Sequence, residues 1–499
     1  MRQSISYEMI LSCFTSRLLK PLIAFFVKTR LTKRESIVRV LISLLRGRRS
    51  LMVMFLSSLA VSAAAQETLT LQRAIDLALK QDPWLQQSQY QQLAKENRSI
   101  AASALPDPRV SVGLISLPTD TFNLNQENMT QLQVGISQVF PRGDSLAIKQ
   151  AKLHVEATAF PLLRTDRKAK LKSRVTQLWL DAFLAQKTID LINQDRDLFE
   201  QMTDIAQVSY SSVSGRTRQY DVIRADLELI QLEDRLTVEQ QKLEIALAKL
   251  GEWVLIDQQS DSNRSFDLDV ALSNFRVSEK RPEIDLLSLP ILELMQNSNN
   301  ELVKTLSNHP AILAIDVKHQ ASRKTVELAK QSYKPQWGLN ASYGIRGNNP
   351  SGIDRANLLS IGMSFNVPIF TDHLQDRELA ASVADADAVK TEKLLLMRSM
   401  LSALKKETQQ LQRLSERQKR YSSQLLKQAR QQAEVSLTAY THDDGDFSEV
   451  VGARITELNA RIASLKIDVD ALKTIARINY FFTDAASNGT TSTQQDFGE

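Results

Sequence analysis

The sequence predicts a mainly α-helical protein with a transmembrane β-barrel part, and three observations support this fold class. The chain of 499 residues contains only 15 glycines and 13 prolines, which argues for long helices and against an all-β or loop-rich fold. One order of elements occurs twice along the chain at a nearly constant offset. Two strand-like runs in each half alternate apolar residues with small or polar ones.

The N-terminal segment is predicted to be a signal for secretion. Three arginines precede the short apolar run Leu51–Val61, and small residues follow at Ala63 and Ala65. The alternative is a membrane anchor, but this run is too short, because a membrane-spanning helix needs about 20 residues. We therefore assign residues 1–65 to a signal peptide with an N-terminal extension, cleaved after Ala65.

The charge of the mature chain differs in sign from that of the full sequence. The full chain carries 62 basic and 57 acidic residues, but residues 1–65 hold eleven of the bases and two of the acids. The mature chain is therefore slightly acidic, and nucleic-acid binding through a basic surface loses its support. The one cysteine, Cys13, also lies in this segment, so no disulfide or thiol catalyst is expected afterwards.

The remaining chain is a duplicated half. Asp82-Pro83 corresponds to His309-Pro310 and Pro141 to Pro368, both at an offset of 227 residues, whereas the later segments Asp221–Ala225 and Glu449–Ala453 correspond at 228. We place the first repeat at 66–251 and the second repeat at 301–482. Residues 252–300 form a polar segment between them, and residues 483–499 form a C-terminal tail that is predicted to be disordered.

Each half has the same predicted elements in the same order. Pro83 and Pro310 suit the first turn of a helix, with Asp82 and His309 as caps. That helix ends near Ala104 in the first half and near Ser332 in the second. Two strands follow, and then come a very long helix and a return helix. The long helices are expected at about 145–211 and 372–438, and the return helices at about 217–250 and 447–480.

The long and return helices are predicted to pair as antiparallel coiled coils. Apolar residues recur at alternating steps of three and four, for example at Ile455, Leu458, Ile462, Leu465, Val469 and Leu472. A helix of 67 residues is roughly 100 Å long at 1.5 Å per residue, which is too long for a compact domain. Each half is therefore expected to contain a long helical hairpin.

The strands are predicted to cross a membrane. Strands of about ten residues with one apolar face and one small or polar face are typical of transmembrane barrels. The alternative is a half-buried sheet of a soluble protein. The residues predicted to face lipid are Val110, Val112, Leu114, Val134, Ile136, Trp337, Leu339, Tyr343, Ile361, Met363 and Phe365.

Four strands cannot form a barrel alone. About eight strands is the practical minimum, and an open sheet edge is not tolerated in lipid. Two copies would give eight strands and a barrel filled by its own side chains, whereas three copies give twelve strands and an open interior. We therefore expect a trimer with one shared 12-stranded barrel, whose helical hairpins surround a hollow α-barrel tunnel.

The chain resembles the outer-membrane efflux (TolC) family of trimeric channel-tunnels over about residues 67–482. The first half contains Gly135-Ile-Ser-Gln138, Phe140-Pro-Arg-Gly143 and the tip-like segment Gly215–Ala225, and the second half contains Gly445-Asp-Phe447. Leu117-Pro-Thr-Asp-Thr-Phe122 with Gln126-Glu-Asn-Met-Thr130 resembles the branch that serves heavy-metal resistance-nodulation-division pumps.

This resemblance implies a passive exit duct in the outer membrane that extends into the periplasm. Its expected partners are two further copies of the chain, a periplasmic adaptor protein, an inner-membrane resistance-nodulation-division pump and outer-membrane lipid. The cargo would be heavy-metal cations or otherwise drugs and small molecules. Part of residues 252–300 would form an equatorial belt with the C-terminal region.

The resemblance also implies a gate at the periplasmic tips. Asp221 and Tyr440 match two members of the family's closing network, and Glu449 matches part of an acidic ring. The family's arginine position holds Gly445 in this sequence, and the next acidic position holds Gly452. The closure is therefore expected to differ in detail from that of the family.

The second tip carries the acidic run His442-Asp-Asp-Gly-Asp446. Repeated around a threefold axis, Asp443, Asp444 and Asp446 would form a negative pore mouth that favours cations. The simpler interpretation is a solvated turn, in which Asp and Gly are common for backbone reasons. His442 is a weak candidate for a metal ligand, and we expect no metal site.

The sequence indicates no enzyme and no cofactor, since it contains no nucleophile elbow, phosphate-binding glycine loop or zinc-binding His-Glu-x-x-His motif. Two alternatives to efflux stay open. The same tube could serve type I protein secretion, or the chain could be a periplasmic coiled-coil scaffold that forms no channel.

Overall fold

The computed structural model describes residues 67–211, 218–254, 275–286, 299–442 and 445–484. From Thr68 onward the chain forms one unit. The predicted signal segment, residues 485–499 of the tail that is predicted to be disordered, and the acidic residues Asp443 and Asp444 lie outside the described residues.

Within its described residues, the first half contains four helices and two long strands. Helix α3 spans Leu71–Gln81 and α4 spans Pro83–Ala101, with Asp82 as the predicted cap, since its carboxylate accepts a hydrogen bond from the Trp84 backbone N–H. Strands β2 (Arg109–Ile115) and β3 (Gln131–Phe140) follow. The long helix α5 (Ser145–Ser211) continues through Pro161 and is followed by the return helix α6 (Gln219–Val254).

The second half repeats this order. Helix α9 (Asn299–Ser307) precedes α10 (Pro310–Gln331), whose cap is His309 as predicted, because its Nδ1 accepts a hydrogen bond from the Ala311 N–H. Strands β5 (Gln336–Ile345) and β6 (Leu358–Asn366) follow. The helices α11 (Gln375–Arg420), α12 (Leu426–Thr441) and α13 (Phe447–Phe481) complete the half.

The second long helix differs from the expectation of one uninterrupted α-helix. A π-helical turn, η3 (Tyr421–Leu425), separates α11 from α12. The hydroxyl groups of Ser422 and Ser423 both donate to the Lys419 carbonyl, at 3.3 and 2.6 Å. Such side-chain bonds compete with the regular helical hydrogen bonds, and they give a local reason for the wider turn.

Some elements were not predicted from the sequence. They are α3, α9 and the two short strands β1 (Glu67–Leu69) and β4 (Phe275–Val277), which pair with each other. The buried Trp179 indole of α5 donates a hydrogen bond to the Leu69 carbonyl at 2.9 Å. This bond fixes β1 against the long helix.

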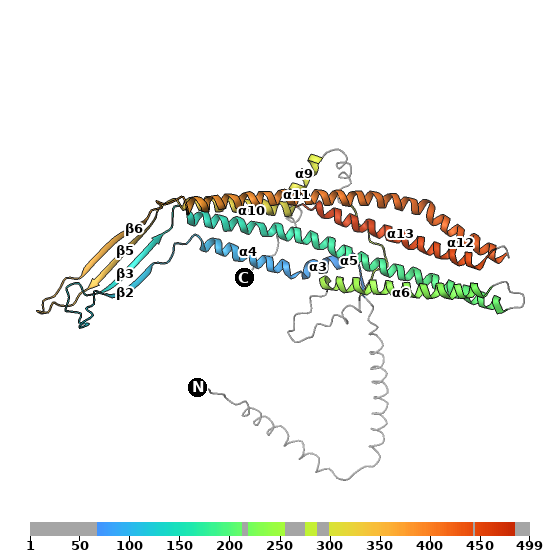
Figure 1. Ribbon diagram of the computed structural model, residues 1–499, viewed down its shortest axis with the longest axis horizontal. Coiled ribbons are helices and arrows are strands. Elements are labelled where there is room, and N and C mark those ends of the chain that lie inside the picture. Colours follow the sequence, from blue (N-terminus) through green and yellow to red (C-terminus); the bar gives the residue numbers. More distant parts are fainter. Residues whose placement is uncertain (1–66, 212–217, 255–274, 287–298, 443–444, 485–499) are drawn as a thin grey trace, which may run out of the picture. The chain divides into compact units, whose positions relative to one another are not determined.

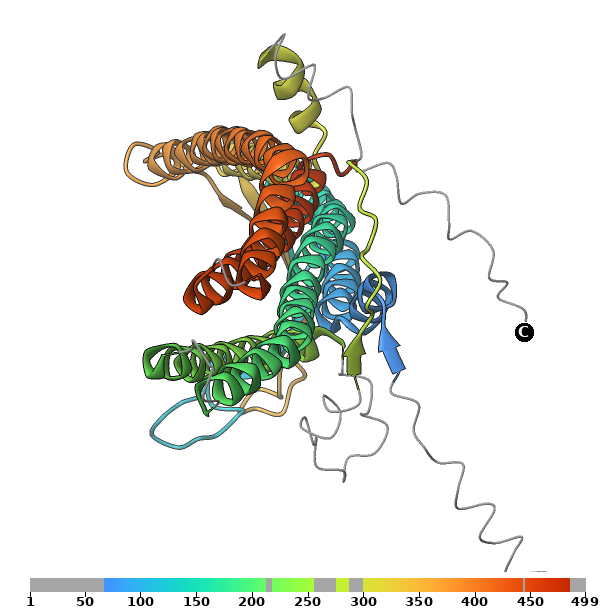
Figure 2. The same cartoon turned by 90° about the vertical axis from the view of Figure 1, so that its right-hand side faces the viewer.

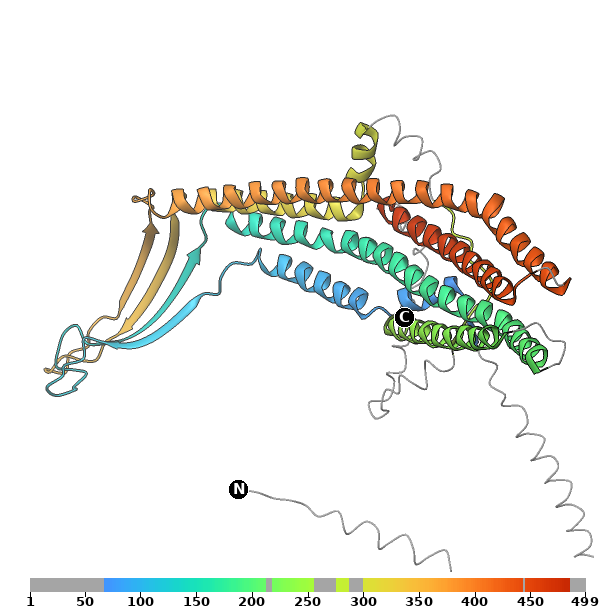
Figure 3. The same cartoon turned by 45° about the vertical axis from the view of Figure 1, so that its right-hand side comes forward.

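Helix packing centres on α5, which contacts α4, α6, α10 and α13 (Figure 1). Helix α5 with α6, and α12 with α13, form two antiparallel pairs, as Figures 2 and 3 show. One apolar cluster joins α3, α5, α6 and α13 around Trp179 and Leu180. A second joins the tip ends of α5, α6 and α13 around Phe199 and Phe447. The predicted long antiparallel helical hairpins are therefore present, and their coiled-coil packing stays a prediction.

The four long strands form one antiparallel sheet in the order β2-β3-β5-β6. Each half contributes one hairpin, and the two halves meet where β3 pairs with β5, for example at Gly135 and Ser342. Among the described helices, none is both long and apolar enough to span a lipid bilayer.

Candidate channel wall and helical tips

The strand register brings the predicted lipid-facing residues onto one face of the sheet. Val112 pairs with Val134, Val134 with Tyr343, and Tyr343 with Leu359, so one row crosses all four strands. Because side chains alternate along each strand, the other predicted residues fall on the same face. All eleven of them expose between 37% and 76% of their surface in the single chain.

An aromatic row lies at the helix-proximal end of this apolar face, and sequence reasoning missed it. Phe140 pairs with Trp337, which in turn pairs with Phe365. The Phe140 and Trp337 rings stack with their centroids 4.1 Å apart. From Trp337 to Ile345 the strand rises roughly 27 Å, or roughly 21 Å at a barrel tilt of 40°, close to the apolar band of about 25 Å in outer-membrane barrels. Such girdles mark the interface between lipid and water.

The opposite face of the sheet is mostly small and polar, with Ile115, Val139 and Leu358 as apolar exceptions near its ends. All five glycines within these strands lie on it, namely Gly113, Gly135, Gly338, Gly344 and Gly362. The space beside Gly135 is filled by a neighbour, since a Cβ there would lie 2.8 Å from the Ser111 hydroxyl. Gln133 donates a hydrogen bond to the Ser342 hydroxyl at 2.6 Å. This face is therefore suited to water and the other face to lipid.

The sheet has two open edges in the single chain. Within the described residues, β2 pairs only with β3, and β6 pairs only with β5. The outward N–H and C=O groups of β2 and β6 therefore need partners wherever water is absent.

The predicted gate residues lie at the tip ends of their helices. Asp221 is at the start of α6, where its carboxylate accepts a hydrogen bond from the Arg218 N–H at 3.0 Å. Tyr440 is near the end of α12, and its ring packs edge-on against Phe447 at 5.6 Å. Tyr440 and Val222 both pack against the second apolar cluster, so the two tips share one hydrophobic cluster. Within one chain, Asp221 therefore accepts a hydrogen bond at the start of α6, and Tyr440 packs on Phe447 at the other tip.

Gly445 lies at a turn where a side chain would fit only tightly. A Cβ on Gly445 would lie 3.0 Å from the Tyr440 nitrogen and 3.1 Å from two atoms of Ala439. The arginine that the family resemblance would place here would therefore require this turn to shift by a few tenths of an ångström. Gly452, by contrast, faces open space.

The remaining acidic tip residues are exposed. Asp446 is the N-cap residue of α13, but its side chain makes no capping hydrogen bond, and Glu449 lies in the first turn of the same helix. His442 ends α12 and is also exposed. In the part of the chain that the structure describes, no cluster of three or more His, Cys, Asp or Glu residues could hold a metal ion.

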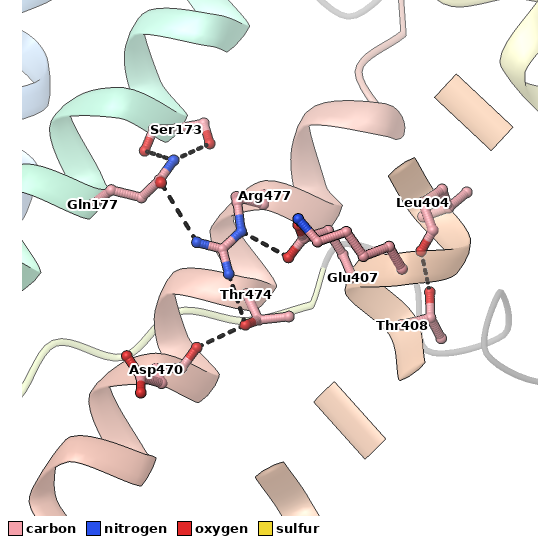
Figure 4. Close-up of polar contacts among 9 residues, drawn as sticks. Ser173, Gln177, Leu404, Glu407, Thr408, Asp470, Thr474 and Arg477 are labelled. Carbon is pink, nitrogen blue, oxygen red and sulfur yellow. Dashed lines mark hydrogen bonds and ion pairs between the residues drawn. The ribbon is translucent and has the colours of Figure 1, made fainter. Parts of the chain in front are cut away.

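A buried polar network joins α5, α11 and α13, and sequence reasoning missed it (Figure 4). Arg477 donates from Nε to Glu407 at 2.7 Å and from Nη2 to the Thr474 hydroxyl at 3.0 Å. Its Nη1 lies 3.5 Å from the Gln177 amide oxygen of α5. The Glu407 side chain is only 8% exposed. The sequence contains one indication of this network. Glu407 is an acidic residue that lies between Leu404 and Leu411, two residues of the apolar helix-packing pattern.

A second set of polar contacts lies around the cap of α10. His309 is buried, and its Nε2 donates to the Tyr480 carbonyl at 3.1 Å while Nδ1 accepts at the cap. Burial lowers the pKa of His309, which keeps the neutral form that both bonds require. The Tyr480 hydroxyl donates to Asp166 at 2.8 Å, and burial, followed by that carboxylate, raises the pKa of Tyr480.

Comparisons with known proteins agree on the fold. No family model and no curated protein matches the sequence. Among solved structures, the outer-membrane channel OprN matches with a TM-score of 0.65 and 15% identity, covering 83% of this chain and 90% of that one. The Campylobacter jejuni outer-membrane channel CmeC matches with a TM-score of 0.65 at 12% identity, covering 84% and 87%. The Vibrio cholerae outer-membrane protein VceC matches with a TM-score of 0.64 at 14% identity, covering 83% and 96%.

These similarities define the class of fold. The chain has the fold of outer-membrane channels, with long helical hairpins and a four-stranded sheet in each chain. The mainly helical, channel-type fold expected for one chain is thereby confirmed, while the shared 12-stranded barrel and the trimer stay predictions.

Proposed function

We propose that this protein is the outer-membrane channel-tunnel of a tripartite efflux system. Three copies would share a 12-stranded barrel and continue into the periplasm as an α-helical tunnel. Energy and substrate would come from an inner-membrane resistance-nodulation-division pump and a periplasmic adaptor. The channel itself would be a passive duct without catalytic activity.

One observation carries this proposal, namely the two-faced sheet with open edges. Its exposed apolar face is in register across β2, β3, β5 and β6, and its other face is mostly small and polar. A soluble scaffold would leave the apolar face and both edges in water, which favours aggregation. Closure of β2 of one copy on β6 of the next would satisfy both edges in lipid.

The first prediction concerns assembly. The detergent-solubilised protein is expected to be a trimer, because three sets of four strands give a barrel wide enough to conduct. The measurement is the protein mass by light scattering with the detergent contribution subtracted, combined with conductance in planar bilayers. A monomer that inserts and conducts ions would contradict the shared barrel. Protein that stays soluble without detergent would favour the scaffold alternative.

The domain organisation follows from this function. Two efflux repeats, 66–251 and 301–482, would each supply one strand hairpin and one helical hairpin. The segment 252–300 would belong to an equatorial belt, as the β1–β4 pair and the Trp179–Leu69 bond support. Cleavage after Ala65 would release the signal segment during export.

The cargo is proposed only at the level of class. The loop between β2 and β3 resembles the branch that serves heavy-metal pumps, so metal cations are one candidate and drugs or other small molecules are the other. Type I protein secretion through the same duct is the alternative function. Growth of a deletion strain on metal salts and on drugs, compared with export of a secreted protein, separates these three.

The second prediction concerns the gate. We propose that Asp221 and Tyr440 meet between neighbouring copies at the closed periplasmic end. A hydrogen bond to a charged group is worth about 1.5–3 kcal/mol, so removing it from three copies should raise the opening frequency at least tenfold. Single-channel conductance of Asp221→Ala and Tyr440→Phe measures this effect.

The capping role of Asp221 requires a matched control. Asp221→Asn keeps an oxygen that can accept from the Arg218 N–H but removes the charge. If the charge closes the gate, Asp221→Asn should open as Asp221→Ala does. An Asp221→Asn channel that behaves as wild type would show that only the cap matters. If Asp443→Ala alone opens the channel, the closure lies in the acidic turn.

A further inference from the structure

Arg109 occupies a distinct position on the polar face of the sheet. It is the first residue of β2 and pairs with Ser137, which pairs with Asn340, which pairs with Gly362. This row lies at the helix-proximal end of the strands. Arg109 is exposed, and its row neighbours are short and neutral. The guanidinium group therefore extends above a floor of small residues.

Arg109 is also the single charge on this face of the described strands. The other polar-face residues of β2, β3, β5 and β6 are all uncharged: Ser111, Gly113, Ile115, Gln131, Gln133, Gly135, Ser137, Val139, Gln336, Gly338, Asn340, Ser342, Gly344, Leu358, Ser360, Gly362, Ser364 and Asn366. Arg346 lies just beyond β5 at the loop end, where its guanidinium donates to the Ala356 and Asn128 carbonyls.

No carboxylate neutralises Arg109 in the described residues, since none forms an ion pair with it. Four other charged residues at this end have partners of their own. Lys334 pairs with Asp144 at 3.1 Å, and the Arg142 guanidinium donates to the Ser332 carbonyl. Asp376 accepts from the Tyr333 hydroxyl at 2.5 Å. Asp107, two residues before Arg109, is the nearest carboxylate along the chain and is also exposed.

We propose that Arg109 forms a cationic ring at the base of the barrel and that this ring favours anionic solutes. The inference rests on the proposed trimer, in which three copies of Arg109 line one level of the lumen. A barrel of twelve strands at 4.8 Å spacing and 40° tilt has a radius of roughly 12 Å. The guanidinium groups lie inside that wall, so their distance from the axis is comparable with the Debye length of about 8 Å at physiological salt.

The ring assigns a chemical class to the cargo at this level of the duct. Rings of Arg or Lys select for anions and phosphate in pores. The favoured solutes would carry carboxylate, phosphate or sulfonate groups. The acidic tip predicted around Asp446 has the opposite charge. A solute would therefore pass a region that favours cations at the tip and a region that favours anions at the base of the barrel. The contribution of Arg109 is therefore measured as a difference between variants of the same channel.

The test is the reversal potential of the full-length channel in planar bilayers under a KCl gradient. Compared with wild type, Arg109→Gln and Arg109→Glu should raise the K⁺ to Cl⁻ permeability ratio in that order. Three charges near 8 Å from the axis, with screening, correspond to a change of roughly 2- to 7-fold. Asp107→Asn should lower the ratio. Ser111→Glu places a carboxylate on the same face and should raise the K⁺ to Cl⁻ permeability ratio. This variant replaces Arg109→Glu in the test if Arg109→Glu does not insert into the membrane.

The outcomes separate this inference from the proposed function. Conducting trimers whose permeability ratio is the same in wild type, Arg109→Gln and Ser111→Glu would overturn the ring and leave the channel intact. A change in conductance without a change in reversal potential would also overturn it, because that result indicates altered packing. A wild-type protein that forms no channel would overturn the proposed function and the ring together.

Discussion

Replacing Arg477 by Met is expected to destabilise the protein by about 2–4 kcal/mol, which would make it one of the most damaging single changes in the helices. Breaking a buried ion pair by removing one partner typically costs 3–5 kcal/mol, because the other charge is left buried. The Glu407 side chain is 8% exposed and Arg477 is 28% exposed, so partial solvation reduces the effect. Lys406, with its Nζ 3.6 Å from Glu407, gives limited compensation.

The double variant Glu407→Leu with Arg477→Leu should recover most of this loss. Replacing a buried ion pair by apolar residues is often neutral or stabilising. The corresponding position in the first half, 227 residues before Glu407, is Leu180, which is fully buried in its own apolar cluster. Leucine at position 407 therefore resembles what the first repeat already uses.

The measurement is the unfolding midpoint of the detergent-solubilised protein, followed by helical circular dichroism. Arg413→Met is the matched control on α11, because its pair with Glu416 is exposed on the helix surface. Exposed pairs of this kind contribute between about 0 and 1 kcal/mol. If Arg477→Met costs no more than Arg413→Met, the network in Figure 4 does not hold α5, α11 and α13 together.

Much of the fold could be predicted because its signals are local and periodic. The bounds of α5 follow approximately from a stretch without glycine that runs from Asp144 to Ser214, and the caps at Asp82 and His309 follow from the prolines after them. The strand faces follow from alternation alone, since a shift by one residue would exchange them. The pairing of β3 with β5 is not local, and it became visible only in the structure.

The candidate site was less predictable, for physical reasons. Charges on coiled coils are usually solvated, so Glu407 was not distinguished from its neighbours, although it interrupts the apolar seam. The π-turn η3 depends on how two adjacent serines bond to the Lys419 carbonyl, a choice that composition does not determine. Asp221 was predicted for the gate, whereas the bond that the structure shows for it, accepted from the Arg218 N–H, was not predicted.

Replacing Met363 by Arg is expected to cost about 2–4 kcal/mol of folding free energy in a bilayer, the range for Arg or Lys at mid-membrane on the lipid face of a barrel. Met363 lies within β6, pairs with Leu339 on the apolar face and is 58% exposed in the single chain. A cation there would have to leave water for hydrocarbon. The measurement is the fraction of protein folded into lipid vesicles along a urea titration.

Ser364→Arg is the matched control, because it is the next residue on the same strand and lies on the opposite face. Ser364 pairs with Gly338, which presents no side chain, and its neighbours Gly362 and Asn366 on that face are small or polar. An arginine at this position would stay in the water of the lumen, so Ser364→Arg should fold about as well as wild type. Equal loss of folding in both variants would show that the two faces of the sheet are misassigned. Loss of folding in Ser364→Arg alone would reverse the assignment of the two faces. The apolar face would then line the interior of a soluble assembly instead of contacting lipid.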